Sequence, residues 1–365
     1  MRVLLSAGEA SGDAYAAALV RHARPLLPEA QWGALGGSKL RAEGVPLWED
    51  TSRWGAIGVV QSLRVAPLAA LGFLRTVRRL REGEPGVLVP IDFGFFNVRL
   101  AQRAKRHGWR VLYFIPPGCW RRDRGGAGLR GMVDAVSTPF AWSAENLRRD
   151  GLDAHWFGHP LRQLVAEASR AAQARGERLA VLPGSRTHEL EANLPALAAA
   201  LRDWPTAIEF AVAPTLEARE VEGRWRRLSG RSQDAFQTHG AAASLLGCRA
   251  AVVCSGTATL EAALCGCPMV VVYRLSRLMA LEARLLRLNV RHISLPNILL
   301  QREAVPELVH TGATPEAIRA QAEAVWGGPA REAQLASFAE LEELLGPPDG
   351  ISRTAELLAT LARRS

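Results

Sequence analysis

Short apolar runs alternate with longer amphipathic stretches along most of the chain. In the first half these runs are Val3–Leu5, Val87–Val89, Val111–Phe114 and Val133–Val136, the last interrupted by Asp134. In the second half they are Leu179–Leu182, Ile208–Val212, Ala250–Cys254 and Met269–Val272. Buried strands that alternate with helices are typical of parallel sheets with helices on both faces. The pattern predicts an α/β protein with two doubly wound, Rossmann-like parallel sheets.

A polar stretch, residues 162–178, separates the two series of strands. The 365 residues suffice for two domains of ordinary size. We expect one domain over residues 1–165, a second over 176–345 and a C-terminal helix over 346–365, of which 352–364 is amphipathic. Ligands of such sheets bind beyond the carboxyl ends of the strands, so a cleft between the two domains is the expected binding site.

Composition excludes several other classes of protein. Hydrophobic residues make up 48% of the chain and charged residues 22%, as in soluble globular proteins, and no apolar run is long enough to predict a transmembrane helix. The N-terminal apolar run is too short for a signal peptide and enters a Gly-rich turn at once. Five scattered cysteines indicate reduced thiols in a cytoplasmic protein.

The net charge of +9 suits a surface that faces nucleic acid, anionic lipid or phosphorylated substrates. Only Lys39 and Lys105 of the 45 basic residues are lysines, and coding bias alone would give such a skew towards arginine. A basic surface without a dedicated partner is therefore an equal alternative.

One small-residue turn opens the second domain. Gly184, Ser185 and Arg186 lead into a helix with Glu189 in its first turn. A glycine lets the backbone approach a ligand closely, and a guanidinium suits a phosphate group. The alternative is an ordinary helix cap, made by Ser185 or Glu189, beside a solvated arginine.

A second small-residue turn, Ser255–Gly256–Thr257, follows a later strand of the same domain. Free amides and hydroxyls at a helix N-terminus suit a diphosphate, and Glu261, one helical turn on, could take two ribose hydroxyls. Alternatively Ser255 and Thr257 only cap the helix and Glu261 forms a surface ion pair. Because both turns belong to one sheet, they should face one crevice. Neither a P-loop nor a G-x-G-x-x-G fingerprint is present, which favours a nucleotide sugar over NAD or ATP.

The first domain has a comparable turn, Gly8–Glu9–Ala10–Ser11–Gly12–Asp13, before a helix predicted from about Ala14. Small residues at a helix start favour contact with an anion or a sugar oxygen. The alternative is a tight turn in which Ser11 or Asp13 caps the helix.

Asp92 ends a later strand of the first domain and is followed by Phe93, Phe95 and Phe96. Partial burial among these rings would raise the pKa of the carboxyl group and suit a general base. The alternative is that Asp92 caps the next helix.

Three further features have simpler interpretations. Cys265 and Cys267 have no second pair of metal ligands, so they indicate buried thiols rather than a zinc site. His159 either contacts a ligand at the hinge or packs within its own turn. The basic amphipathic stretch 60–81 places Leu68, Leu71, Leu74, Val77 and Leu80 at helical spacing, and such a stripe faces either an anionic membrane or the core.

Several motifs, in this order, resemble those of the lipid-A-disaccharide synthase family. They are GEASGD (8–13), ID-x-x-x-FN (91–97), LPGSR-x-x-E (182–189), SGTATLE with CPMVVVYR (255–274) and SLPN (294–297), and GHPL (158–161) also fits. The resemblance covers residues 3–310, which is nearly the whole chain.

The resemblance implies a GT-B fold, in which two Rossmann-like domains face a cleft. It implies an inverting transfer of 2,3-diacylglucosamine from UDP to the acylated sugar phosphate lipid X, by a peripheral protein on the cytoplasmic face of the inner membrane. The implied partners are the UDP-linked acylated glucosamine donor, a glycolipid acceptor and an anionic membrane surface. No metal, cofactor or nucleic acid is expected, and a homo-oligomer is left open.

The resemblance also implies roles for individual residues. Asp92 and Glu9 are the expected catalytic carboxylates. The acceptor side is expected to include Gly8, Ser11, Gly12 and Asp13. The donor is expected to lie on Gly184, Ser185, Arg186, Glu189, Ser255, Gly256, Thr257, Glu261 and Asn297.

Three features on the acceptor side depart from the family pattern. Phe95 stands where the family has a second carboxylate, Gln61 replaces a glutamate, and residues 115–120 differ from the family's SPSVWAW, with Trp120 offset. The donor-side motifs are intact. The resemblance therefore implies a UDP-sugar site with an acceptor that can differ from the family's.

Two other functions share part of this pattern. A GT-B UDP-sugar 2-epimerase would also bind UDP but would need no lipid-facing surface, and the stretch 60–81 argues against it. A non-enzymatic UDP-sugar or lipid binding protein would have no use for the carboxylate of Asp92.

Overall fold

The computed structural model describes the chain except for residues 53, 55–58, 171–173, 276–290 and 364–365. The side chains of residues 59–64, including Gln61 and the start of the stretch 60–81, also lie outside the described part. The chain divides into two compact units. Unit 1 comprises Met1–Leu164 and Leu345–Ser365, and unit 2 comprises Val165–Leu344.

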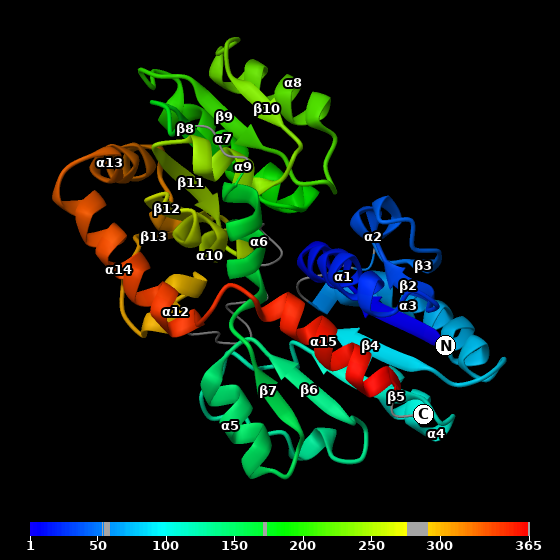
Figure 1. Cartoon of the computed structure of the whole chain (residues 1–365). Helices are drawn as coiled ribbons and strands as arrows, with labels where there is room; N and C mark the ends of the chain where they lie inside the picture. Colours follow the sequence, from blue (N-terminus) through cyan, green and yellow to red (C-terminus); the bar gives the residue numbers. More distant parts are fainter. Residues whose placement is uncertain (53, 55–58, 171–173, 276–290, 364–365) are drawn as a thin grey trace. The chain divides into compact units, whose positions relative to one another are not determined.

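Unit 1 is built on a parallel sheet with the strand order β3-β2-β1-β4-β5-β6-β7 (Figure 1). Its strands are β1 (Arg2–Ala7), β2 (Gln31–Gly36), β3 (Leu47–Asp50), β4 (Val87–Ile91), β5 (Arg110–Phe114), β6 (Ala135–Thr138) and β7 (Ala154–Trp156). Its helices are α1 (Ala10–Ala23), α2 (Ser38–Ala42), α3 (Val59–Leu80), α4 (Gly94–Arg106), α5 (Ala141–Arg149) and α15 (Gly350–Arg363), with α6 (Pro160–Ser169) crossing into unit 2. The central strands are apolar on both faces because helices cover both faces of the sheet.

The two faces of the unit 1 sheet pack against different helices. Leu4, Leu88 and Val111 form a core with Leu80 of α3 and Leu100 of α4. On the other face, α15 packs along α1 and crosses β4 and β5 (Figure 1). The expected C-terminal helix is thus an integral part of unit 1.

Unit 2 has the strand order β10-β9-β8-β11-β12-β13, again parallel throughout. Its strands are β8 (Leu179–Leu182), β9 (Ile208–Ala211), β10 (Ala235–Gln237), β11 (Ala250–Cys254), β12 (Met269–Tyr273) and β13 (Glu307–Val309). Its helices are α7 (Thr187–Leu201), α8 (Ala218–Ser229), α9 (Ala241–Gly247), α10 (Thr257–Leu264), α12 (Leu295–Leu300), α13 (Pro315–Trp326) and α14 (Pro329–Leu345).

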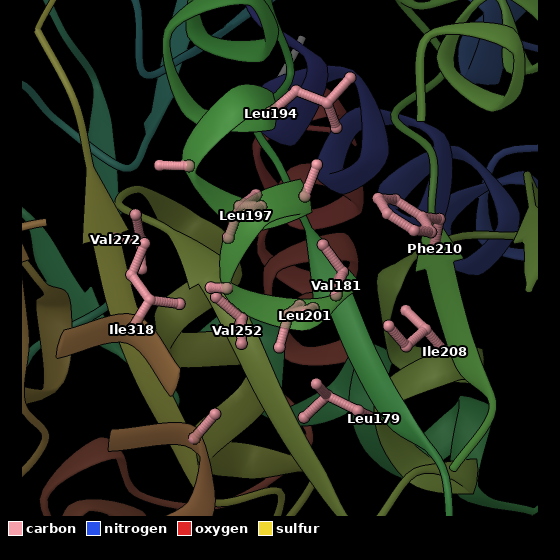
Figure 2. Packing of buried hydrophobic residues seen from close by; sticks show 14 of the residues in the cluster. Leu179, Val181, Leu194, Leu197, Leu201, Ile208, Phe210, Val252, Val272 and Ile318 are labelled. Atoms are coloured by element: carbon pink, nitrogen blue, oxygen red, sulfur yellow. The ribbon is translucent and has the colours of Figure 1, made fainter. Parts of the chain in front are cut away.

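The core of unit 2 lies between its sheet and α7. Figure 2 shows Leu194, Leu197 and Leu201 of α7 over Val181 and Val252 of the central strands. All five side chains are at most 2% exposed, so this apolar cluster fixes the helix on the sheet.

The predicted α/β class with two parallel sheets is confirmed, and the predicted strands of unit 2 match the observed ones closely. The predicted strand 133–136 is shifted, since β6 begins at Ala135. The carboxylate of Asp134 accepts hydrogen bonds from Val111 N at 2.7 Å and from Lys105 Nζ at 2.7 Å, so it ends the preceding turn instead of joining the strand.

Helix α3 contains the basic amphipathic stretch and resolves its two interpretations. Val77 and Leu80 are buried in the core of unit 1. Leu68, Leu71 and Leu74 are 47%, 46% and 65% exposed. The stripe is therefore part core and part surface. None of the helices in the described ranges is long and apolar enough to span a membrane.

Candidate active site

In unit 1, two connections leave the carboxyl edge of the sheet side by side. Ala7 of β1 pairs with Ile91 of β4, so Gly8 and Asp92 are the next residues of neighbouring strands. A Cβ atom on Gly8 would lie 2.2 Å from the ring of Phe93, so only glycine allows this approach. The fold thereby brings Glu9 close to Asp92.

Asp92 sits in a strained backbone position beside a second carboxylate. Its φ is 48°, in the left-handed region that non-glycine residues rarely adopt. Solvent reaches its side chain, yet the surrounding protein removes enough hydration to raise the pKa from 3.8 to about 6, and the charge of Glu9 adds to the rise. The residue capping α4 is Phe93, with no side-chain hydrogen bond, so Asp92 is not a helix cap.

The start of α1 differs from its prediction. The helix begins at Ala10 rather than near Ala14, so Ser11, Gly12 and Asp13 lie in its first turn. The sequence of small residues is therefore helix, not loop. A Cβ on Gly12 would lie 3.4 Å from Cβ of Ala7, which lets the helix approach the strand closely.

The hydrogen bonds of Asp13 give this predicted acceptor-side residue a structural role. The residue is 5% exposed, and its carboxylate accepts from the amides of Gly37 at 2.8 Å and Lys39 at 2.9 Å. It therefore anchors the start of α2 and does not cap α1.

In unit 2, the two predicted turns also lie side by side at one edge of the sheet. Leu182 of β8 pairs with Val253 of β11, so the turns that follow these two strands, from Pro183 and from Ser255, emerge as neighbours. The expectation that both turns share one edge is confirmed.

The first of these turns is held by Glu189. Gly184 has a φ of +124°, and a Cβ there would lie 2.6 Å from Cβ of Glu189. Glu189 is 3% exposed, accepts from Ser185 N at 2.8 Å and pairs with Arg186 Nη1 at 3.0 Å. In the structure Glu189 caps the turn and orients the guanidinium of Arg186.

The second turn presents backbone rather than side chains. Gly256 caps α10 with a φ of +145°, and a Cβ on it would meet no atom of the described residues within 4 Å. Ser255 donates its hydroxyl to Ile293 O at 2.7 Å, while Thr257 is the first residue of the helix. Glu261 lies one turn further and is half-buried. Among the described residues, the start of α10 thus has room beside Gly256, and the amides of a helix N-terminus suit an anion.

Asn297, a predicted donor contact, has a structural role. It is 0% exposed. Its Nδ2 donates to Val305 O and Glu307 Oε1, both at 2.8 Å, and its Oδ1 accepts from Ala304 N at 2.7 Å and Val305 N at 2.9 Å. These four bonds saturate the amide group, so no donor or acceptor is left for a ligand.

The remaining candidates are structural in the described residues. Cys265 and Cys267 are buried free thiols, and burial raises the pKa of Cys267 to about 11. His159 is buried, accepts from Leu161 N at 3.2 Å and has its pKa lowered by burial to about 3, so it is the packed turn histidine. No group of three or more metal-ligating side chains occurs in the part of the chain that the structure describes.

Two buried asparagines at these edges had no role in the sequence-based interpretation. Asn97 of α4 binds the backbone of β1 and β4, and Asn193 of α7 binds the backbone beyond β8 and β12. Asn97 ends the ID-x-x-x-FN motif, but its bond to β1 could not be predicted, because Ser6 is far away in the sequence. The bonds of Asn193 to Cys254 and Arg274 are equally distant in the sequence.

The two parallel-sheet units define the class of protein. Solved structures with the same fold include the UDP-GlcNAc 2-epimerase of Methanocaldococcus jannaschii in complex with UDP-GlcNAc and UDP (TM-score 0.61, 11% identity, covering 98% of this chain and 99% of that chain). Acinetobacter baumannii MurG (0.56, 13%, 98% and 99%) and the calicheamicin glycosyltransferase CalG4 (0.58, 14%, 99% and 98%) are also similar. The fold is GT-B.

The family follows from sequence comparison. Residues 3–345 match the family described as lipid-A-disaccharide synthetase. The lipid-A-disaccharide synthase of Syntrophus aciditrophicus is 34% identical over 393 aligned positions that cover 100% of this chain and 98% of the relative. That of Myxococcus xanthus is 33% identical, covering 99% and 97%. The chain belongs to the lipid-A-disaccharide synthase family and is a glycosyltransferase.

Proposed function

We propose that the protein transfers an acylated glucosamine from a UDP-linked donor to a glycolipid acceptor and releases UDP. The observation that carries this proposal is the full-length match to relatives named lipid-A-disaccharide synthase. The acceptor is left as a glycolipid class, because Phe95 and residues 115–120 depart from the family pattern on that side.

The chemical step needs a base for the acceptor hydroxyl. Asp92 is the proposed base, because its raised pKa of about 6 leaves it ionised yet basic near neutral pH. The acceptor oxygen attacks the anomeric carbon, the bond from that carbon to the diphosphate oxygen breaks, and the proton passes to Asp92. UDP leaves with the bonding electrons, and the anomeric configuration inverts.

The donor is assigned to unit 2. We expect Arg186 and the amides of Gly256 and Thr257 to meet the diphosphate charge without a metal ion or other cofactor. Glu261 is the proposed contact of the ribose hydroxyls. Glu9 contributes through its charge, which keeps the pKa of Asp92 high.

The acceptor is assigned to unit 1, where apolar and cationic side chains lie close to Asp92. Phe95, 80% exposed, is three residues further along the chain, and the guanidinium of Arg99 lies 3.6 Å from its ring centre. Trp120, 50% exposed, follows Cys119, whose pKa is raised by burial and by the charge of Asp92. Exposed rings beside cations suit an acylated sugar that carries a phosphate.

The membrane contact is assigned to α3. Its exposed leucines, Leu68, Leu71 and Leu74, lie on a helix that also carries Arg75, Arg78 and Arg79. Apolar side chains flanked by arginines are typical of helices that lie on anionic bilayers. We propose a peripheral location on the cytoplasmic face of the inner membrane.

The test is UDP release from the UDP-linked acylated glucosamine donor, with and without a phosphorylated monosaccharide lipid. Release that depends on the lipid, with a disaccharide lipid found by mass spectrometry, supports the proposal. Interconversion of the donor into its 2-epimer without lipid would indicate an epimerase. Donor binding with neither product would indicate a binding protein, and either result would overturn the proposal.

A further inference from the structure

The carboxyl edge of each sheet carries a buried asparagine at its switch point. In unit 1 the strand order reverses direction between β1 and β4, and in unit 2 it reverses between β8 and β11. Connections that leave such a pair of strands run to opposite faces of the sheet, which opens the crevice where ligands bind. Asn97 is 0% exposed at the first point and Asn193 is 1% exposed at the second.

Asn97 joins the two strands that lead to the candidate base. Its Nδ2 lies within hydrogen-bonding distance of three carbonyl oxygens, those of Ser6 at 3.0 Å, Ile91 at 3.2 Å and Asp92 at 2.9 Å. Its Oδ1 accepts the hydroxyl of Ser6 at 2.6 Å. The carbonyl of Asp92 also accepts from Tyr113 OH at 3.1 Å. These bonds hold Asp92 in its left-handed conformation.

Asn193 joins the two turns of the donor side. Its Nδ2 donates to Pro183 O at 3.0 Å, directly before Gly184, and to Cys254 Sγ at 3.3 Å, directly before Ser255. Its Oδ1 accepts from Arg274 N at 2.9 Å, just beyond β12. One planar amide thus fixes the spacing of three neighbouring connections.

We propose that Asn97 and Asn193 are positioning residues with separate effects, Asn97 on the chemical step and Asn193 on donor affinity. This proposal rests on the function proposed above. Asn97 acts through the orientation of the Asp92 carboxylate. Asn193 acts through the relative position of the Gly184–Arg186 and Ser255–Thr257 turns, which must both fit one diphosphate.

The experiment uses the full-length protein with three leucine substitutions, Asn97→Leu, Asn193→Leu and Gln334→Leu. Gln334 is a matched control, because it is a buried amide, 3% exposed, that binds Met269 N at 2.8 Å and Met269 O at 2.9 Å at the amino end of β12. For each variant we would measure the melting temperature, the Kd of UDP by calorimetry, and kcat at saturating donor and acceptor.

Asn193→Leu should raise the Kd of UDP by roughly tenfold or more and leave kcat within about threefold of the parent, since lost hydrogen bonds to the turns weaken only donor binding. Asn97→Leu should lower kcat by roughly tenfold or more with an unchanged Kd. Gln334→Leu should lower the melting temperature alone. The proposal is overturned if the two asparagine variants change the same quantity, or if all three lose activity in proportion to their melting temperatures.

Milder variants keep the test valid if a leucine variant does not fold. Ser6→Ala removes only the hydroxyl that binds Asn97 Oδ1, and Cys254→Ala removes only the sulfur that accepts from Asn193. Ser6→Ala should lower kcat, and Cys254→Ala should raise the Kd of UDP, each by a smaller factor than the leucine variant. A change of the Kd in Ser6→Ala, or of kcat in Cys254→Ala, overturns the proposal. If the parent releases no UDP with any lipid, the proposed function fails instead, while the Kd of UDP still tests Asn193.

Discussion

The two units build similar sheet edges from different residues. In unit 1 the positive-φ residues that directly follow β4 and β5 are not glycines: Asp92 at 48°, Phe93 at 50° and Ile115 at 60°. In unit 2 the positive-φ residues in the turns after β8 and β11 are glycines, Gly184 at 124° and Gly256 at 145°. A non-glycine residue in this region costs about 1–3 kcal/mol, and it persists where its side chain is needed.

This difference suits the two sheet edges to different kinds of contact with a ligand. A strained aspartate presents a side chain, and unit 1 therefore offers a carboxylate that can accept a proton. Glycines instead leave backbone amides open to a ligand, and unit 2 therefore offers an anion site. This contrast agrees with the proposed assignment of the chemistry and the acceptor to unit 1 and of the nucleotide to unit 2.

The largest expected effect comes from Asp92→Asn. Asparagine tolerates the left-handed backbone, so the fold and the Kd of UDP should not change, but loss of the base should lower kcat by roughly 10²–10⁴-fold. Saturating donor and acceptor keep a change of affinity from resembling a change of chemistry. Asp153→Asn, at the amino end of β7, is the matched control. If the kcat of Asp92→Asn lies within a few fold of the parent's kcat, Asp92 is not the base and the assignment of the chemical step to unit 1 is wrong.

The direction in which Asp92→Asn changes the stability of the fold follows from the raised pKa of Asp92. The pKa of Asp92 is raised from 3.8 to about 6, so the folded state holds the proton of this carboxyl more tightly than the unfolded state does. The free energy of unfolding therefore falls as pH rises from about 4 to 6, and this fall is complete above pH 6. Asp92→Asn should therefore melt at or above the parent's temperature at pH 7.5. A lower melting temperature would mean that the carboxylate supports the fold.

Arg186→Ala should have the next largest effect. Loss of a charge-assisted hydrogen bond to the diphosphate should cost about 1.5–3 kcal/mol, which is a roughly 10- to 100-fold higher Kd for UDP. Calorimetry on the full-length protein measures it. Glu189→Gln is the informative partner, because glutamine keeps an oxygen for Ser185 N but loses the acceptor that orients Arg186, so UDP affinity should fall by a smaller factor than in Arg186→Ala. Equal UDP affinity in Arg186→Ala and the parent would contradict the assignment.

The exposed leucines of α3 should have a smaller effect. Leu71→Ser with Leu74→Ser should reduce co-sedimentation with anionic vesicles on the order of tenfold, since each side chain would bury only part of its surface in lipid. Attraction by the arginines should weaken as salt rises. Leu228→Ser, at a leucine 41% exposed in unit 2, controls for lost surface hydrophobicity. Vesicle binding equal to that of the parent would show that α3 does not face lipid.

Glu9→Gln should give the smallest change, a shift in the pH profile. The parent's kcat/KM for the acceptor should rise with pH and level off above about 6, because the ionised form of Asp92 is the active base. Removing the charge of Glu9 makes ionisation easier, so the profile should move to lower pH. Desolvation is the larger cause of the raised pKa, so only part of the shift should disappear. If the pH profile of Glu9→Gln equals that of the parent, the charge of Glu9 does not raise the pKa of Asp92.

Most of the fold could be predicted from hydrophobic pattern, and the exceptions have physical causes. Central strands such as β8 and β11 are buried on both faces and therefore form continuous apolar runs. Edge strands such as β10 and β13 lie half in solvent, so their residues carry no such signal. Their existence depends on pairing with a neighbour rather than on local sequence.

The candidate site was predictable as turns but not as individual contacts. Residue type and spacing located the edges around Gly184 and Ser255, because glycines and helix starts are local features. Asp13, Glu189 and Asn297 have the same residue types as ligand contacts, yet each binds backbone amides of its own unit. Only tertiary structure distinguishes a polar group committed to the protein from one open to a ligand.

The division of work between the units is tested most directly by titrating UDP into a fragment that contains unit 2 alone, residues 165–344, with circular dichroism as a check that it folds. We expect the Kd of UDP for the folded fragment to lie within a few fold of that for the full-length protein. Arg186→Ala should raise this Kd by the same factor in both. A folded fragment that does not bind UDP, beside a full-length protein that does, would contradict the assignment of the donor to unit 2.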